Sequence, residues 1–171
     1  NVMDRKDIPY TRIYATVDLD KVAWNMEQMK ANLPEGTGMI AVVKTDGYGH
    51  GAAPVAWAAD AYVQMYAVAS AEEALNLKRH GITKPVLILG PVHDSHYESL
   101  IREEIRIPVF TWKQASELSK QAMSVGKDAW IHLAVDTGMN RIGMRPDEAS
   151  AQLVGKIFRL PGIQVEGLFT H

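Results

Sequence analysis

The sequence predicts an α/β protein whose core is a parallel β-sheet with crossover helices. Short runs rich in β-branched residues alternate along the 171 residues with longer segments whose apolar positions recur at helical spacing. The short runs are apolar at most positions, which is typical of strands covered on both faces. These observations favour a (β/α) barrel or a doubly wound sheet, and they leave the choice between the two open.

The apolar runs predict seven strands, separated by six helices. The first strand is expected at 12–19, "RIYATVDL". The other strands are expected at 39–44, 65–70, 85–90, 106–111, 130–136 and 165–171. The helices are expected at 20–32, 50–60, 70–81, 95–104, 112–126 and 146–160.

Several predicted helices carry signals at their ends. Ser70 and Glu73 have the spacing of a capping box, Asp20 can cap the first helix, and Pro146 suits a helix start. Glycine, the favoured residue just after a helix, occurs at Gly81 and Gly126.

Composition excludes several classes of function. The net charge is −2 and the charged residues, 22% of the chain, are scattered, so no basic face for nucleic acid is expected. There is no cysteine, which excludes disulfides, thiolate nucleophiles and Cys-based metal sites. No apolar run is long enough to span a bilayer. We therefore expect a cytoplasmic protein that binds small metabolites, without a membrane or nucleic-acid partner. The histidines His80, His93, His96 and His132 fit no metal-ligand spacing.

A lysine at the end of a predicted strand is the first candidate for chemistry. Lys44 lies in "AVVKTDGYGHGA" (41–52), where the three glycines that follow allow the backbone to approach a ligand closely. Tyr48 supplies a hydroxyl, and the helix that begins after it suits an anion. A lone lysine at a strand end is more often a surface residue. In a desolvated pocket, however, its amine can attack a carbonyl and form a Schiff base with an aldehyde cofactor.

Three stretches resemble the fold-type III alanine racemases, a family of amino acid racemases that depend on pyridoxal 5′-phosphate (PLP). The lysine segment is similar to the family's Lys…Tyr-Gly-His-Gly signature, "VDTGMNRIGM" (135–144) to its Asp-Thr-Gly-Met segment, and "VEGLFTH" (165–171) to its Glu-Gly-x-x-Thr-His strand. The opening "RIYATVDLDKVAWN" is similar to the family's amino-terminal stretch. The resemblance implies a (β/α)8 TIM-type barrel, here incomplete, with about six barrel strands and one N-terminal strand.

The resemblance also implies roles for individual residues. Lys44 is expected to hold PLP covalently and to act as one of two acid/base groups at the α-carbon of the substrate. Tyr48 is expected near the cofactor phosphate and His171 against its pyridine ring. Arg141 is expected to contact the phenolic oxygen of PLP and the substrate carboxylate, since a guanidinium binds a carboxylate in a bidentate manner. His50 is expected to be structural.

The implied activity is an isomerase reaction, the interconversion of L-alanine and D-alanine by two-base α-proton transfer, which supplies D-alanine for cell-wall peptidoglycan. In the family the second base is a tyrosine from a partner subunit, so a homodimer is expected. Two alternatives remain: a serine racemase of the same fold, and a non-catalytic PLP-binding protein built on a lone barrel.

Two departures from the family pattern lead to further expectations. An eight-stranded barrel typically takes ~250 residues, so residues 1–171 are expected to be the N-terminal PLP-binding barrel domain of a longer protein and to be inactive alone. Many family members carry a carbamylated lysine where this chain has Ala134. A small anion such as chloride, or the side chain of Asn140, is expected to lie beside Arg141 instead.

Overall fold

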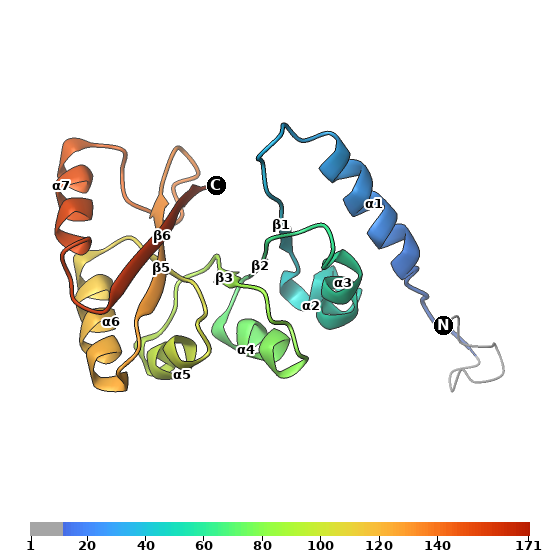
Figure 1. Ribbon diagram of the computed structural model, residues 1–171, viewed down its shortest axis with the longest axis horizontal. Helices are drawn as coiled ribbons and strands as arrows, with labels where there is room; N and C mark the ends of the chain where they lie inside the picture. The colour runs from blue at the N-terminus through green and yellow to red at the C-terminus, as the bar shows by residue number, and fades with distance from the viewer. Residues whose placement is uncertain (1–11) are drawn as a thin grey trace.

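Six parallel strands form one curved wall, with helices along its outer side (Figure 1). The computed structural model describes residues 12–171. The strands are β1 (Ile40–Val42), β2 (Met65–Val68), β3 (Val86–Ile88), β4 (Ile107–Val109), β5 (Ala129–Val135) and β6 (Ile163–Thr170). The helices are α1 (Leu19–Ala31), α2 (Lys44–Tyr48), α3 (Ala52–Ala59), α4 (Ala71–Arg79), the 3₁₀ helix η2 (Asp94–His96), α5 (Tyr97–Arg102), α6 (Trp112–Val125) and α7 (Glu148–Ile157).

The strands follow one another across the wall in chain order. β1, β2 and β3 form one parallel sheet, and β4, β5 and β6 form another. A parallel bridge between Leu87 and Arg106 joins β3 to β4, and the N–H of Ile88 donates to the Arg106 carbonyl at 3.0 Å. A doubly wound sheet reverses its strand order at a switch point. The unbroken order therefore identifies a (β/α) barrel, which the described residues do not close.

All six predicted barrel strands are confirmed, but the strand predicted at 12–19 is wrong. Residues 13–18 have no regular secondary structure, and Leu19 already belongs to α1. A strand needs a neighbour to satisfy its backbone hydrogen bonds, and residues 12–171 contain none that pairs with this segment. Ile13, at 83% exposure, is accordingly unpacked.

The helix-start residues predicted for α1 and α7 differ from those observed. The carboxylate of Asp18 accepts the N–H of the third residue of α1 at 3.2 Å, so Asp18 is the N-cap and Asp20 lies inside the first turn. In α7 the carboxylate of Asp147 caps the helix in the same way, and Pro146 precedes the cap. In both cases the side chain that reaches the free N–H groups is an aspartate directly before the helix.

The other predicted helix ends are confirmed in part. The Ser70 hydroxyl accepts the Glu73 N–H at 3.3 Å at the start of α4, and Gly81 and Gly126 take positive φ angles of 80° and 72° after α4 and α6. The reciprocal bond of a capping box is absent, because the Glu73 carboxylate accepts from two other backbone N–H groups.

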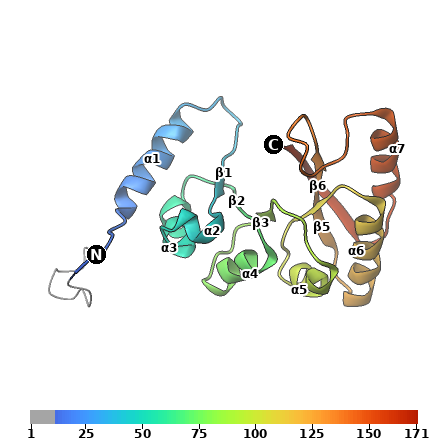
Figure 2. The same cartoon turned by 180° about the vertical axis from the view of Figure 1, so that it is seen from behind.

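The hydrophobic core lies between the strands and the helices α3 to α6, which Figures 1 and 2 show along one side of the wall. Tyr66 of β2 and Ile88 of β3 are fully buried there. The strands are predicted to be buried on both faces, but β1 is buried on one face only. Its Ala41 is buried, whereas Ile40 and Val42 on the opposite face are 47% and 41% exposed. Within residues 12–171 no helix is long and apolar enough to cross a membrane.

Candidate active site

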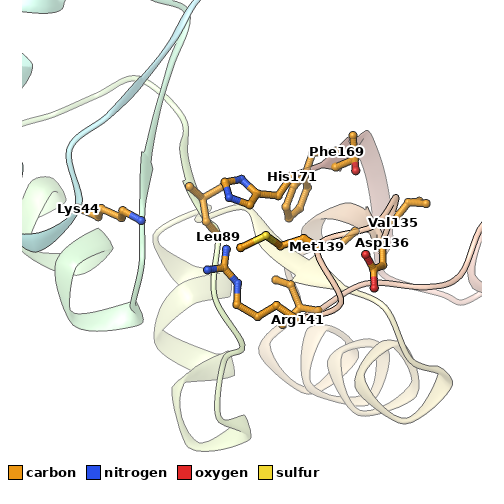
Figure 3. Close-up of a pocket in the computed structure, with 11 residues that line it drawn as sticks. Lys44, Leu89, Val135, Asp136, Met139, Arg141, Phe169 and His171 are labelled. Atoms are coloured by element: carbon orange, nitrogen blue, oxygen red, sulfur yellow. The ribbon is translucent and has the colours of Figure 1, made fainter.

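A pocket lies at the carboxyl-terminal ends of the strands, with β1 on one side and β5 and β6 on the other (Figure 3). Functional groups in parallel barrels collect at this end. Lys44 follows β1, Leu89 follows β3 and His171 follows β6. The lining residues are Lys44, Leu89, Ala134, Val135, Asp136, Met139, Arg141, Ile142, Phe169, Thr170 and His171.

Lys44 lies where β1 stops, at the start of an unusual left-handed turn. Thr45, Asp46 and Tyr48 have φ angles of 53°, 52° and 56°, and Gly47 between them has 62°. This conformation costs a residue with a side chain about 1–2 kcal/mol, so the surrounding contacts must hold it in place. Figure 3 shows the half-buried Lys44 side chain pointing toward His171 and Arg141.

Local hydrogen bonds stabilise this turn. The Gly47 N–H donates to the Val43 carbonyl at 2.9 Å, and the Asp46 carboxylate accepts the N–H of Ala52, the first residue of α3, at 2.8 Å. His50 Nδ1 lies 3.0 Å from the Gly47 carbonyl oxygen. His50 therefore contacts the turn itself rather than the pocket.

Tyr48 is the one predicted site residue that the structure does not bring to the pocket. Its side chain is 59% exposed and is not among the groups that line the cavity. Tyr48 lies in the left-handed turn, with three residues between it and Lys44.

Arg141 is carried by a loop, 136–144, that folds back on the end of β5. The Asp136 carboxylate accepts the N–H groups of Gly138 and Asn140 at 2.9 and 3.0 Å, and these bonds hold the pKa of Asp136 below its ordinary value. The Met144 N–H donates to the Ala134 carbonyl, and the Asp136 N–H donates to the Met144 carbonyl, both at 2.8 Å. The loop is thus closed at both ends, and Arg141 lies at its tip.

His171 is positioned by the pairing of β5 with β6. Seven residue pairs link these strands, from Ala129 with Ile163 to Val135 with Thr170. Just beyond them, the hydroxyls of Thr137 and Thr170 hydrogen bond to each other. This contact ties the Arg141 loop to the residue before His171.

A polar cluster lies farther from the carboxyl-terminal ends of the strands. It is formed by Arg106, just before β4, His132 of β5 and Glu166 of β6. Arg106 Nε and Nη2 donate to the two Glu166 oxygens at 2.8 and 2.7 Å, and His132 Nε2 lies 3.0 Å from Glu166 Oε2. The Arg106 guanidinium also stacks 5.0 Å from the centre of the Trp130 ring. Hydrogen bonding from Arg106 is the main cause that lowers the pKa of Glu166 to about 2. The bidentate pair therefore stays ionised across the physiological range.

Ala134 has no acidic group, and the Arg141 guanidinium has no charged partner among the described residues. Within residues 12–171, no hydrogen bond or ion pair engages that guanidinium. Among the described residues, the Asn140 side-chain oxygen accepts no bond from Arg141, and its amide nitrogen donates to the Gly138 carbonyl at 3.0 Å, so this structure gives no support to Asn140 as the substitute acceptor.

The lining chemistry suits an anionic aromatic compound that carries a carbonyl. Lys44 offers a primary amine and Arg141 a guanidinium, while Leu89, Met139 and Phe169 supply apolar surface. PLP has these features: a phosphate, a phenolate, an aromatic ring and an aldehyde. The residues of the pocket therefore fit PLP by chemical type. Within residues 12–171 there is no cluster of three potential metal ligands.

Sequence reasoning missed the apolar part of the pocket. Leu89 could have been found, because it closes a predicted strand and so lies at the same end as Lys44. Met139 and Phe169 lie inside the two motif segments, but residue type alone does not show which way their side chains point.

Comparison with known proteins agrees with this architecture. A family profile described as alanine racemase, N-terminal domain, matches residues 17–171. The alanine racemase of Clostridium tetani is 42% identical over 160 residues, which are 93% of this chain and 41% of the relative. That of Symbiobacterium thermophilum is 42% identical over 159 residues, 92% of this chain and 42% of the relative.

Solved structures give the same result. An alanine racemase of Clostridium difficile 630 matches with a TM-score of 0.87 at 37% identity, covering 90% of this chain and 40% of that one. The alanine racemase from D-cycloserine producing Streptomyces lavendulae matches with a TM-score of 0.86 at 33% identity, covering 96% and 44%.

The fold and the pocket define a barrel protein with a lysine-containing site at the carboxyl ends of its strands. The chain belongs to the alanine racemase family, whose members are PLP-dependent. It spans about two fifths of the length of the relatives it matches.

Proposed function

We propose that residues 1–171 form the N-terminal PLP-binding barrel domain of an alanine racemase. The complete protein interconverts L-alanine and D-alanine, and thereby supplies D-alanine for peptidoglycan. The observation that carries this proposal is the meeting of Lys44, Arg141 and His171 in one pocket of a chain from this family. The named relatives are alanine racemases, which favours alanine over serine as the substrate.

Each of the three side chains has a distinct task. When bound, PLP delocalises the electron pair left on the α-carbon as its proton departs. Lys44 anchors the cofactor, and its Nζ takes or returns the proton at the α-carbon. The Arg141 guanidinium binds the substrate carboxylate through two parallel N–H donors. His171, which lines the same pocket, would contact the cofactor ring.

One lysine reaches only one face of the α-carbon, and inversion needs a proton donor on the other. We place this second group outside residues 12–171. Assembly as a homodimer that completes the site, the location of the protein in the cytoplasm, and a phosphate contact by Tyr48 remain predictions.

The assignment of Lys44 is tested by replacing it in the complete protein. We expect Lys44→Ala to abolish covalent attachment of PLP and to lower kcat by at least about 10²–10⁴-fold, the usual contribution of a proton-transfer group. After borohydride reduction, intact mass spectrometry should show one added cofactor on the wild type and none on the variant. Lys113→Ala, on α6, is the control and should behave like the wild type. A cofactor mass that persists in Lys44→Ala would show that another lysine carries PLP.

A further inference from the structure

The end of the β1–β2 ladder has an irregular hydrogen-bonding pattern. The last regular bond runs from the Val43 N–H to the Ala67 carbonyl at 2.9 Å. In a parallel ladder the next repeat would pair the Ala69 N–H with the Val43 carbonyl, and the Thr45 N–H with the Ala69 carbonyl. Neither bond forms: the Val43 carbonyl accepts from Gly47 within the left-handed turn, and the Thr45 N–H donates to a side chain.

The two N–H groups left over are satisfied by one side chain. The Glu73 carboxylate accepts the Thr45 N–H through Oε1 and the Ala69 N–H through Oε2, each at 2.7 Å. Both distances lie at the short end for such bonds, as expected when the acceptor carries a charge. A carboxylate has two acceptor oxygens and no donor, so it can serve two N–H groups side by side. Glu73 thus occupies the place of the missing ladder repeat.

One of the two Glu73 contacts lies directly beside Lys44, at Thr45. If the ladder continued, Thr45 would remain in the strand, and the turn of positive φ angles would have no reason to form at Lys44. Since three residues with side chains adopt that turn against their steric preference, it persists only while its contacts hold it. The bond from Glu73 to Thr45 fixes the residue next to Lys44.

We propose that Glu73 is a positioning residue for the Lys44 amine, acting by replacing the β1–β2 ladder at the point where Lys44 leaves it. The inference rests on the proposed function of Lys44. This role of Glu73 is distinct from capping the helix, because the Ser70 hydroxyl supplies the cap at the start of α4.

The test compares Glu73→Gln with Glu72→Gln in the complete, PLP-loaded protein. Both changes remove one carboxylate from the first turn of α4, so the effect on the helix terminus is matched. Glutamine at 73 keeps one acceptor oxygen but turns an NH₂ group toward the other backbone N–H. The Glu72 carboxylate lies 3.3 Å from His96 and also hydrogen bonds to its own backbone and to the Ser70 side chain, but it is not an acceptor for Thr45 or Ala69.

Three measurements are needed. Hydrogen exchange, followed by mass spectrometry of peptides over 43–48 and 67–70, reports the Thr45 and Ala69 bonds without reference to catalysis. Visible circular dichroism of the bound cofactor reports its orientation at Lys44. Steady-state kinetics separate kcat from KM.

For Glu73→Gln we expect faster exchange in both peptides, an altered dichroism spectrum and a kcat lowered about 10-fold to 10²-fold, since small misplacements of a reacting group cost this much. Glu72→Gln should match the wild type in all three.

Two results would overturn the proposal. Unchanged exchange in Glu73→Gln would show that the two bonds do not hold the turn. Faster exchange with unchanged dichroism and kcat would show a purely structural role. If Glu73→Gln does not fold, Glu73→Asp keeps the charge but is too short to span both N–H groups, and it is judged by the same outcomes. Should the wild type fail to racemise alanine, the proposed function fails, while exchange and dichroism still test the role of Glu73.

Discussion

At the scale of single residues, Gly143 shows how tightly the Arg141 loop is folded. Its φ is 115°, and an added Cβ would lie 2.6 Å from the Asp136 nitrogen and 2.8 Å from the Val135 carbonyl carbon. These are backbone atoms of the segment that leaves β5, so they cannot move aside cheaply. Gly138, in the same loop, has a φ of 136° but no atom within 4 Å of the added Cβ.

The two glycines make a matched pair of variants. Both Gly143→Ala and Gly138→Ala impose backbone strain of about 1–3 kcal/mol. Only Gly143→Ala adds overpacking, worth about 1–3 kcal/mol more, and it displaces the Asp136–Met144 hydrogen bond beneath Arg141. We expect the larger drop in urea midpoint, and a higher KM for alanine, in Gly143→Ala. Equal urea midpoints for the two variants would contradict the close approach of Gly143 to the backbone of Val135 and Asp136.

The residues of the site were predictable to the extent that strand ends were. Lys44 and His171 follow apolar runs, so the sequence indicated that they share one end of the sheet. Arg141 lies in a loop, and only the motif pointed to it. Its placement depends on backbone bonds from Asp136 and Met144, which residue types do not reveal. The contact of Glu73 with Thr45 joins residues 28 positions apart and left no trace in local spacing.

At the scale of elements, Glu166 marks an irregularity in β6. Ile131 pairs with Val165 and His132 with Gly167, so Glu166 is an extra residue in the ladder. Its carboxylate contacts Arg106, which immediately precedes β4, and His132 of the adjacent β5. A Cβ on Gly167 would lie 2.7 Å from His132 Cε1, so glycine leaves room for the imidazole. One carboxylate thereby links three strands below the pocket.

The low pKa of Glu166 gives a pH-dependent contribution to stability. Because its folded pKa, about 2, lies below the ordinary value of 4.5, the contribution is complete above pH 4.5 and is lost as the pH falls toward 2. We expect Glu166→Gln to reduce the unfolding free energy by about 1–3 kcal/mol at neutral pH, the worth of hydrogen bonds to a charged group. The gap from the wild type should stay constant between pH 7 and 5 and narrow below pH 4.5.

Urea denaturation at a series of pH values measures this gap. Glu98→Gln is the control, since Glu98 pairs with Arg102 on one helix with both side chains 56% exposed. Such a surface pair contributes no more than about 0.5 kcal/mol. A gap for Glu166→Gln that widens at low pH would reverse the assigned direction of the pKa shift.

Elements were predictable where periodicity and sheet pairing agreed. The six barrel strands each have a parallel neighbour, and all were found. The stretch 12–18 has strand-like composition but no partner within residues 12–171, so composition misled. For α2 the composition does not favour the turn that the structure contains, so this element was not predicted. Residues such as Thr45 and Asp46 rarely adopt positive φ, and here local hydrogen bonds act together with a contact from the distant Glu73 to keep them there.

At the scale of the whole molecule, residues 12–171 form one wall of a barrel with two open edges. β1 and β6 each have a strand on one side only. Ile40 and Val42 of β1 and Leu168 of β6 are 47%, 41% and 63% exposed. Strand edges with unpaired N–H and C=O groups beside apolar side chains favour association between chains.

We therefore expect the isolated 171-residue chain to self-associate and to lack racemase activity, because the second proton-transfer group is proposed to lie outside it. Light scattering coupled to size-exclusion chromatography should give a mass that rises with concentration. The double variant Ile40→Thr, Val42→Thr keeps β-branched side chains, which suit a strand, but makes this edge polar and should lower the mass. Met123→Thr changes a more exposed apolar residue, on α6, and should not lower the mass. A monodisperse monomer would contradict the predicted association through the open edges, and measurable turnover of L-alanine would show that the 171-residue chain already contains both proton-transfer groups.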